Sequence, residues 1–572
     1  FAGNILYAEA QQEKRVTGTV ISEGEPLPGV SVQLKGASSG TITDIDGNYS
    51  IEAPGSGTLV FRFVGMRTVE QPVNNRSVIN ITLEAESKEL DEVMVVAYAT
   101  AKKYSFTGAA STMKAGEIEK LQTSSVSRVL EGTVSGVQAS AASGQPGTDA
   151  EIRIRGIGSI NASSAPLYVV DGVPFDGSIN SINPEDIASL TVLKDAASAA
   201  IYGAEAGNGV VLITTKKGKS GQGKITYDFQ WTTQSLARIP KMMNSEQYID
   251  YMVESKTYTE NYMLRNWDGI TNTSWSDEVF ENSQMQKHNI AFTNGSEKGN
   301  YYLSLTYLDN NGIVKGDADV YKRLTATINS EYEIKSWLKV GTTNQIEKYN
   351  TRTVSSNNEY GSMLASILQA DPLTPFSYTY DELPSNMLKP MLEGKHFLDD
   401  GNGNYYAVSK FTAGESYHPM IMRDNNINKS SGFNVNGSIY ADFKPIKDIT
   451  ITSRFGYRLS GSRSSNTDLP FYGNATQSRD YVSHNASSST NIYYQWENFA
   501  NYMKRFGMHT VTGMVGMSYQ ESTNDYVNGS LSANGEDAVK KNDPLFYFLN
   551  YGSASATKGV GGEKTRSAKL SY

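Results

Sequence analysis

The 572-residue chain has no cysteine, only five histidines and no long apolar run. Without cysteine it can form no disulfide and carries no thiolate nucleophile, so its stability must come from burial or from a closed sheet. No apolar segment approaches the roughly 20 residues that a membrane-spanning helix needs. This excludes a helical inner-membrane protein but not a β-barrel, whose strands give only a weak alternating signal.

An excess of cationic side chains is also missing, because the formal net charge is −9 and the pI is about 5.4. A protein that binds nucleic acid generally needs a strongly basic surface. We therefore predict no nucleic-acid partner.

The usual catalytic motifs are absent as well. A zinc peptidase needs His and Glu at fixed short spacings, and none of the five histidines has that arrangement. The sequence Gly156-Ile157-Gly158 lacks the third glycine of a dinucleotide-binding loop. We predict that the protein is not an enzyme.

Glycine and tyrosine, by contrast, are abundant, with 51 and 35 residues. This composition suits a large β structure whose aromatic side chains meet an interface. Residues 1–10 end in Ala8-Glu9-Ala10, an A-x-A pattern that we interpret as the remnant of an export signal peptide rather than an ordinary chain terminus.

Residues 15–85 contain short alternating runs separated by turn residues, which predicts a small antiparallel β-sandwich. The run Thr43 to Tyr49 resembles the carboxypeptidase-regulatory-like, transthyretin-type domain. Its Asp46-Gly47 pair is typical of a hairpin turn. We favour a turn over a calcium loop there, because the downstream acidic ligand is missing.

Residues 86–104 form a linker that contains an acidic pair followed by a β-branched run, from Asp91 to Val96. The run favours a strand, yet no adjacent segment offers it a partner. One interpretation is a strand kept for an external protein through β-augmentation. The other is the first strand of the next domain, residues 105–220, which we expect to be a mixed α/β unit.

From residue 223 to 572, long segments alternate apolar and polar residues with a period of two. Residues 225–232 and 433–443 are examples. The polar positions carry Asp, Arg, Gln and Asn throughout, and the connections are long. Alternation alone fits a large soluble β protein as well as a membrane barrel. The export pattern and the absence of disulfides favour the barrel.

The ordered motifs resemble the SusC-like (RagA-like) branch of TonB-dependent outer-membrane transporters over the whole chain. The resemblance rests on LDEVMVVAYAT (90–100), SFTGA (105–109), IRIRGIGSIN (152–161), PLYVVDGVP (166–174), LKDAASAAIYGA (193–204) and NGVVLITTKKG (208–218). Ala97, Ala99 and Glu205 depart from the usual pattern. The two alanines matter little to the assignment, because strand pairing uses the backbone.

The resemblance implies a mainly β protein with a β-sandwich, an α/β plug domain and an antiparallel transmembrane barrel of 22 strands, of which this chain holds about half. It also implies a TonB box and a set of plug motif residues. The predicted box is Asp91, Glu92, Val93, Met94, Val95 and Val96. The plug residues are Arg153, Arg155, Gly156, Asp171, Gly172, Tyr202, Gly203, Asn208 and Gly209.

The function that the resemblance implies is active import of a nutrient across the outer membrane, most often an oligosaccharide and less often a peptide. Its partners would be TonB with ExbB and ExbD, a SusD-like surface lipoprotein and outer-membrane lipid. The sandwich and the box would lie in the periplasm. The alternatives are a siderophore, haem or cobalamin importer and, outside transport, a surface adhesin or receptor.

Substrate and metal sites are less well defined by the sequence. Tyr405, Tyr406 and Tyr417 are candidates for stacking on a substrate, although each is more easily interpreted as an ordinary loop tyrosine. We predict no cofactor. The oxygen-rich stretch with Asp399, Asp400, Asn402 and Asn404 has the composition of a calcium loop, but we favour a plain glycine-rich turn.

Overall fold

The computed structural model describes most of the chain, in segments separated by short gaps, and it divides into two compact units. The first unit comprises residues 1–94 and 101–107, and the second comprises residues 95–100 and 108–572. The described residues are 13–22, 25–37, 40–63, 66, 68–83, 93–96, 99–102, 109–141, 143–158, 163–195, 200–219, 221–355, 362–412, 416–506, 509–533, 536–540 and 542–571.

The first unit is the predicted β-sandwich. One sheet has the order β2-β1-β5 with β8 beside β1, and the other has the order β4-β3-β6-β7. Alternate residues meet in a core around Val32, Leu59 and Phe61, all fully buried. The strands are β1 (Glu13–Ser22), β2 (Glu25–Pro26), β3 (Ser31–Leu34), β4 (Gly40–Ile42), β5 (Asn48–Pro54), β6 (Thr58–Arg62), β7 (Val69–Pro72) and β8 (Ile81–Thr82).

The Asp-Gly pair of the sandwich forms a turn. Oδ1 of Asp44 accepts hydrogen bonds from the backbone N–H groups of Asp46 and Asn48, and Gly47 has a φ of 74°. Glycine adopts that left-handed conformation at little cost. The carboxylate of Asp44 therefore stabilises the turn, as expected for a hairpin.

The linker contains β9 (Val93–Val96) and β10 (Ala99–Lys102), which form a two-stranded sheet of their own. Within the described residues, β9 does not join the sheet of the α/β domain that follows. Asp91 and Glu92 of the predicted box lie outside the described residues.

The α/β domain spans residues 109–219 and is built on a five-stranded sheet of order β11-β16-β17-β14-β15, with β12 and β13 as a separate hairpin. Its elements are β11 (Ala110–Lys114), α1 (Ala115–Lys120), α2 (Val126–Val129), β12 (Val137–Ser140), β13 (Glu151–Ile154), β14 (Leu167–Val170), β15 (Val173–Phe175), η2 (Ile179–Ser181), η3 (Pro184–Asp186), β16 (Ile187–Leu193), η4 (Ala200–Ala206) and β17 (Val210–Thr215). Part of the Ala-rich motif 193–204 lies outside the described residues; the described part includes the start of the 3₁₀ helix η4.

Ten long antiparallel strands form a wall in chain order, with β18 at one edge and β31 at the other. The predicted period-2 segments all fall within these strands, which confirms the mainly β fold. The wall consists of β18 (Gly221–Gln234), β19 (Ser283–Gly295), β20 (Gly299–Asn311), β21 (Val320–Lys335), β22 (Leu338–Thr353), β25 (Asn426–Ile446), β26 (Ile449–Asp468), β29 (Ser483–Phe506), β30 (His509–Ser532) and β31 (Thr557–Ser571).

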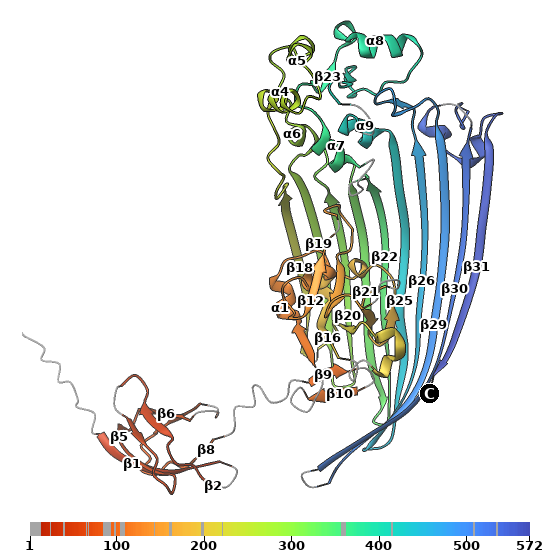
Figure 1. The fold of residues 1–572 in the computed structure, drawn as a ribbon. Coiled ribbons are helices and arrows are strands. Elements are labelled where there is room, and N and C mark those ends of the chain that lie inside the picture. Colours follow the sequence, from red (N-terminus) through yellow and green to blue (C-terminus); the bar gives the residue numbers. More distant parts are fainter. Residues whose placement is uncertain are drawn as a thin grey trace, which may run out of the picture. The chain divides into compact units, whose positions relative to one another are not determined.

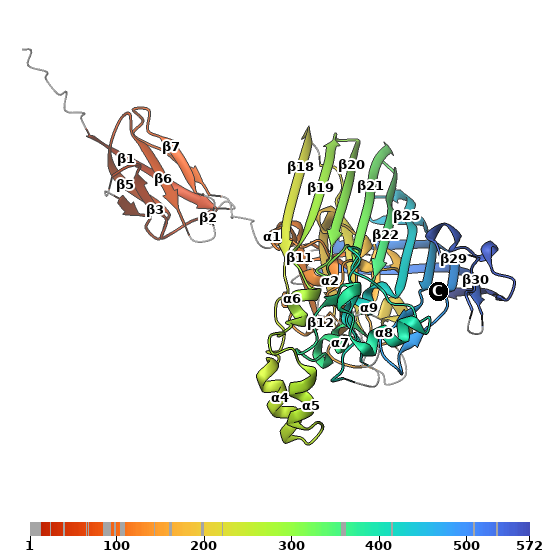
Figure 2. The same cartoon turned by 90° about the horizontal axis from the view of Figure 1, so that it is seen from above.

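The two faces of the wall differ in chemistry. Ile225, Leu305, Ile439 and Trp496 are exposed on the outer face. The inner face carries buried polar residues such as Gln345. The strands follow an arc with the α/β domain on its concave side (Figures 1 and 2). No helix among the described residues is long and apolar enough to cross a membrane.

The long connections at one end of the wall fold into a cap of short helices, whereas tight turns join the strands at the other end (Figure 1). The sequence indicated only long connections there. Residues such as Met387 and Ile421 are nevertheless buried, because they supply small apolar cores to the cap. The cap contains α4 (Ser245–Glu254), α5 (Glu260–Asn266), α6 (Trp275–Val279), α7 (Met363–Gln369), α8 (Ser385–Leu392), α9 (Pro419–Asp424) and the short pair β23 (Ser377–Tyr378) and β24 (Tyr405–Tyr406).

Candidate functional site

The α/β domain contacts the wall through polar groups, and the buried turn η3 makes several of these contacts. Lys287 on β19 forms an ion pair with Glu185 at 2.7 Å between Nζ and Oε1, with side chains only 2% and 18% exposed. The second carboxylate oxygen of Glu185 is buried without a hydrogen-bond partner. Removing the Glu185 carboxylate from water costs free energy, and the attraction to Lys287 offsets that cost.

The neighbours of Glu185 on η3 bind two further strands. Both carboxylate oxygens of Asp186 accept hydrogen bonds, from the hydroxyl of Tyr302 on β20 at 2.8 Å and from Thr327 on β21 at 2.7 Å. Nδ2 of Asn183 donates to Oγ1 of Thr306 at 2.9 Å. The Asn183 side chain also accepts from the N–H of Glu185 and so caps the start of η3. Nothing in the local pattern predicted contacts with the wall.

The turn between β14 and β15 is a second contact with the wall, and it contains two predicted plug residues. The carboxylate of Asp171 accepts from the backbone N–H and the hydroxyl of Thr215, at 2.9 and 2.6 Å, while burial raises its pKa. Gly172 has a φ of 85°, and a Cβ there would lie 2.0 Å from Nη1 of Arg454. Gln495 donates to the carbonyl oxygen of Gly172 at 3.1 Å. Only glycine allows this close approach.

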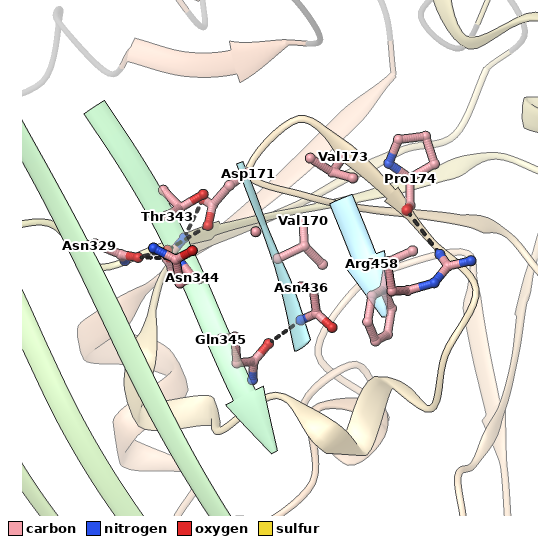
Figure 3. A pocket seen from close by; sticks show the side chains of 13 residues that line it. Val170, Asp171, Val173, Pro174, Asn329, Thr343, Asn344, Gln345, Asn436 and Arg458 are labelled. Atoms are coloured by element: carbon pink, nitrogen blue, oxygen red, sulfur yellow. Dashed lines mark hydrogen bonds between the residues drawn. The ribbon is translucent and has the colours of Figure 1, made fainter. Parts of the chain in front are cut away.

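A small cavity of about 20 Å³ lies between this turn and the wall, beside their direct contacts. Figure 3 shows that Asp171, Val173 and Pro174 face side chains of the wall, among them Gln345 and Arg458. The space is about that of one water molecule, and its lining combines polar side chains such as Asn329 and Asn436 with apolar ones such as Val170 and Phe175. The interface between the domain and the wall can therefore hold water.

Arg458 on β26 holds the end of the same hairpin. It donates to the carbonyl oxygen of Pro174 at 3.2 Å and forms an ion pair with Asp176 at 2.5 Å. Beside it lies a larger cavity of about 470 Å³ between the domain and β26, β29, β30 and β31. Its lining includes Glu205, Tyr493 and Lys569, and Lys569 forms an ion pair with Glu205 at 3.3 Å.

The other predicted plug residues shape the backbone of the α/β domain. Gly156, Gly203 and Gly209 all have positive φ, and a Cβ on Gly209 would lie 3.0 Å from the carbonyl oxygen of Leu193. The remaining predicted residues make local contacts. Arg153 forms an ion pair with Glu151 at 2.8 Å, and Asn208 donates to the carbonyl oxygen of Ser163 at 2.8 Å. Arg155 is exposed, with a φ of 59°. Burial raises the pKa of Tyr202.

The candidate substrate tyrosines lie in the cap. Tyr406 is 1% exposed, and its hydroxyl donates to Asp424 at 2.8 Å. Tyr417 is half-buried and stacks on Phe471, with ring centroids 5.2 Å apart, whereas Tyr405 pairs with β23. Tyr406 and Tyr417 thus pack inside the cap, and their role in substrate binding stays a prediction.

The oxygen-rich loop of the cap directs its carboxylates to its own backbone. Asp399 accepts from the N–H of Gly401 at 2.7 Å, and Asp400 accepts from the N–H of Asn402 at 2.8 Å and from the backbone and side-chain N–H groups of Asn404. These are the bonds of a glycine-rich turn. Among the described residues, no group of three His, Cys, Asp or Glu is placed to hold a metal ion. Calcium binding stays a prediction.

His418, by contrast, is a buried polar residue in the core of the cap. Its Nδ1 accepts from the N–H of Met420 at 3.1 Å at the start of α9, and its Nε2 lies 2.9 Å from the carbonyl oxygen of Phe376. This arrangement requires a neutral ring with its proton on Nε2. The rings of Trp275 and Tyr406 lie 4.8 and 4.9 Å away, and burial lowers the pKa of His418 to about 3.

Comparisons with known proteins agree with this architecture. Residues 102–210 match the TonB-dependent receptor plug domain, and residues 16–95 match the CarboxypepD_reg-like domain. TonB-dependent receptor P39 of Formosa agariphila is 31% identical over 567 residues, covering 97% of this chain and 51% of that receptor. TonB-dependent receptor SusC of Bacteroides thetaiotaomicron is 33% identical over 389 residues, covering 65% of this chain and 37% of that receptor.

The fold is also similar to a solved structure. The RagAB peptide importer in its open-open state aligns with a TM-score of 0.66 at 23% identity, covering 84% of this chain and 54% of that one. The chain spans about half the length of the first curated relatives that it matches. These relatives are receptors and transporters, not enzymes.

The buried ion pair leads to the first prediction. Replacing Lys287 with Met leaves the Glu185 carboxylate buried without a counter-ion, which costs about 3–5 kcal/mol. We expect faster hydrogen–deuterium exchange of β16 in the full-length protein. The double variant Glu185→Gln/Lys287→Met should recover much of the protection because it removes the orphaned charge. Equal exchange in the wild-type protein and in Lys287→Met would contradict a stabilising role for the pair.

The second prediction concerns pH. Because the pKa of His418 is lowered in the folded cap, the unfolded chain takes up a proton below about pH 6.5 while the folded cap does not. The stability that the neutral His418 ring contributes to the cap is therefore fully present above pH 6.5 and is lost as the pH decreases toward 3. At pH 5 the loss is about 2 kcal/mol.

We expect residues 363–424 to exchange hydrogen faster at pH 5 than at pH 7, after correction for the intrinsic rates. His418→Asn keeps an acceptor at the start of α9 but does not titrate in this range. That variant should lose most of the pH dependence. An identical pH response in the variant would show that other groups control the cap.

Proposed function

The chain belongs to the SusC-like TonB-dependent receptors, and from this membership we propose that it forms the plug and part of the barrel wall of an outer-membrane nutrient importer. In this proposal the α/β domain is the plug. The strand wall faces lipid with its apolar side and the transport path with its polar side. The tight turns and the sandwich lie in the periplasm, and the helical cap faces outward.

The observation that carries the proposal is the separation of the apolar core of the plug from the wall. The main buried cluster of the plug contains residues from Met113 to Ile213 only, with Leu190 and Val211 fully buried, and no wall residue belongs to it. Through η3 and the β14–β15 turn, ion pairs and hydrogen bonds join the plug to the wall, with Val173 packed against Gly456 on β26 as an apolar contact. Water can replace the polar contacts, so the plug can shift without exposing its core.

The driving force in this proposal comes through the predicted box. Strand β9 covers Val93–Val96 and has β10 on one side only among the described residues. A strand with one open edge can accept a strand of TonB through backbone hydrogen bonds. TonB, energised by ExbB and ExbD, would then pull on the segment that precedes β11 and the plug in the chain.

For the substrate we propose an oligosaccharide first and a peptide second, delivered with a SusD-like surface lipoprotein that sits over the cap. The support is the family membership and the similarity to SusC. The RagAB structure, a peptide importer by its description, shares the fold and keeps a peptide as the second candidate.

The third prediction tests the box. Val95→Pro removes a backbone N–H and restricts the strand, so it should abolish TonB-driven uptake while leaving the assembled barrel unchanged. Val95→Thr keeps the N–H and serves as the matched control, with uptake near the wild-type level. Uptake is measured in cells, and assembly by the heat-modifiable mobility of the barrel. Normal uptake in Val95→Pro would exclude this strand as the TonB contact.

The fourth prediction concerns the partner. We expect the full-length protein, purified gently from the outer membrane, to carry a stoichiometric surface lipoprotein identified by mass spectrometry. This result would support import of a glycan or peptide. Purification of the receptor alone would favour the alternative, an importer of a siderophore, haem or cobalamin.

A further inference from the structure

The outer face of the wall carries a group of cations just above its apolar band. On β21, the exposed side chain of Leu324 is followed on the same face, toward the cap, by exposed Lys322. On β22, exposed Ile346 is followed by exposed Lys348. Side chains two residues apart on a strand share a face. On both strands the apolar surface therefore gives way directly to a lysine.

The next two strands repeat the pattern with one small residue in between. On β25, exposed Phe433 is followed toward the cap by Ser431 and then by exposed Lys429. On β26, Leu459 is followed by a glycine and then by exposed Arg463. Four consecutive strands thus present a cation at the same side of the apolar band.

The strand register brings these cations together. Lys322 is paired with Asn350, Asn350 with Ser431, and Ser431 with Arg463, so Lys322 and Arg463 lie in one row across four strands. Lys348 and Lys429 stand two residues from this row, on opposite sides of it. Neighbouring strands are about 4.8 Å apart, so the row spans roughly 15 Å. We call Lys322, Lys348, Lys429 and Arg463 the cation row.

Three members of the cation row have no ion-pair partner within the described residues. Lys322 binds Asp309 at 2.9 Å, whereas Lys348, Lys429 and Arg463 form no ion pair there. The carboxylate next to Lys348 in sequence, Glu347, is on the inner face and 2% exposed. The outer face therefore has a local excess of positive charge beside an apolar surface.

We propose that the cation row binds the phosphate groups of phosphorylated lipids, with their acyl chains against Leu324, Ile346, Phe433 and Leu459. The inference rests on the proposed outer-membrane placement, in which the cap side of the wall meets the outer leaflet. Charge complementarity supports this occupant, because phosphates lie directly above the acyl chains of a leaflet. Each cation near an anionic lipid surface contributes roughly a fivefold gain in affinity.

The test uses the triple variant Lys348→Gln/Lys429→Gln/Arg463→Gln in the full-length protein in detergent. Native mass spectrometry with diphosphoryl lipid A measures the bound lipid, and dephosphorylated lipid A is the comparison ligand. We expect the wild-type protein to prefer the phosphorylated form. The triple variant should bind it about a hundredfold more weakly, from three contributions of roughly fivefold each.

The matched control is Lys335→Gln/Lys444→Gln/Lys447→Gln, which removes the same charge from exposed lysines at the tight-turn end of the wall. It should bind as the wild-type protein does. Arg463→Lys keeps the charge and should retain most of the affinity, which separates lost charge from lost folding. Equal weakening in the control, or no preference for phosphorylated lipid A, would overturn the proposal.

Uptake distinguishes this proposal from the transport proposal. If the triple variant loses lipid but still imports substrate in cells, lipid binding is an independent property of the wall. If the Val95→Pro variant has normal uptake while the triple variant loses lipid A, the assignment of the TonB contact fails and the lipid site stands.

Discussion

The structure depends first on the hydrogen-bond ladder of the wall. Each inner strand of the ten-stranded sheet pairs with two neighbours, and the pairing of β26 with β29 continues without interruption from Ile449 to Asp468. A strand in a lipid environment has no water to satisfy its backbone groups, so this ladder is the condition for crossing a membrane. The alternation of side chains, the polar inner face and the contacts of the plug all follow from the register that the ladder sets.

In the proposed transport function, the α/β domain must be held against this wall and still be able to move. An apolar interface with the wall would bury surface at about 25 cal/mol per Å² and resist separation. The observed contacts are directional instead. Asp186 satisfies both oxygens with hydroxyl groups of the wall, and Glu185 has one counter-ion. Such contacts position the plug in one orientation, while their net stabilisation stays small because water offers alternative partners.

Local features of the fold could be predicted from the sequence because their causes are local. The period-2 runs predicted strands such as β25 and β26, and the motif at 166–174 placed Asp171 and Gly172, which form the β14–β15 turn, among the plug residues. The partner of that turn could not be predicted. Gln495 lies 323 residues away, and only the strand pairing of the wall places it against the carbonyl oxygen of Gly172. The helices of the cap were missed for a related reason, since single buried residues such as Met387 pack against distant segments rather than repeating along one helix.

The same limit explains why the cation row was not visible in the sequence. Lys348 directly follows Glu347, which in the linear sequence is a neutral pair of opposite charges. The pleat of β22 separates them, with Glu347 buried on the inner face and Lys348 exposed on the outer face. A shift of one residue in register would exchange the two and place a carboxylate toward lipid. The charge of the outer face is therefore a property of the register, and it acquires meaning only when neighbouring strands align their cations.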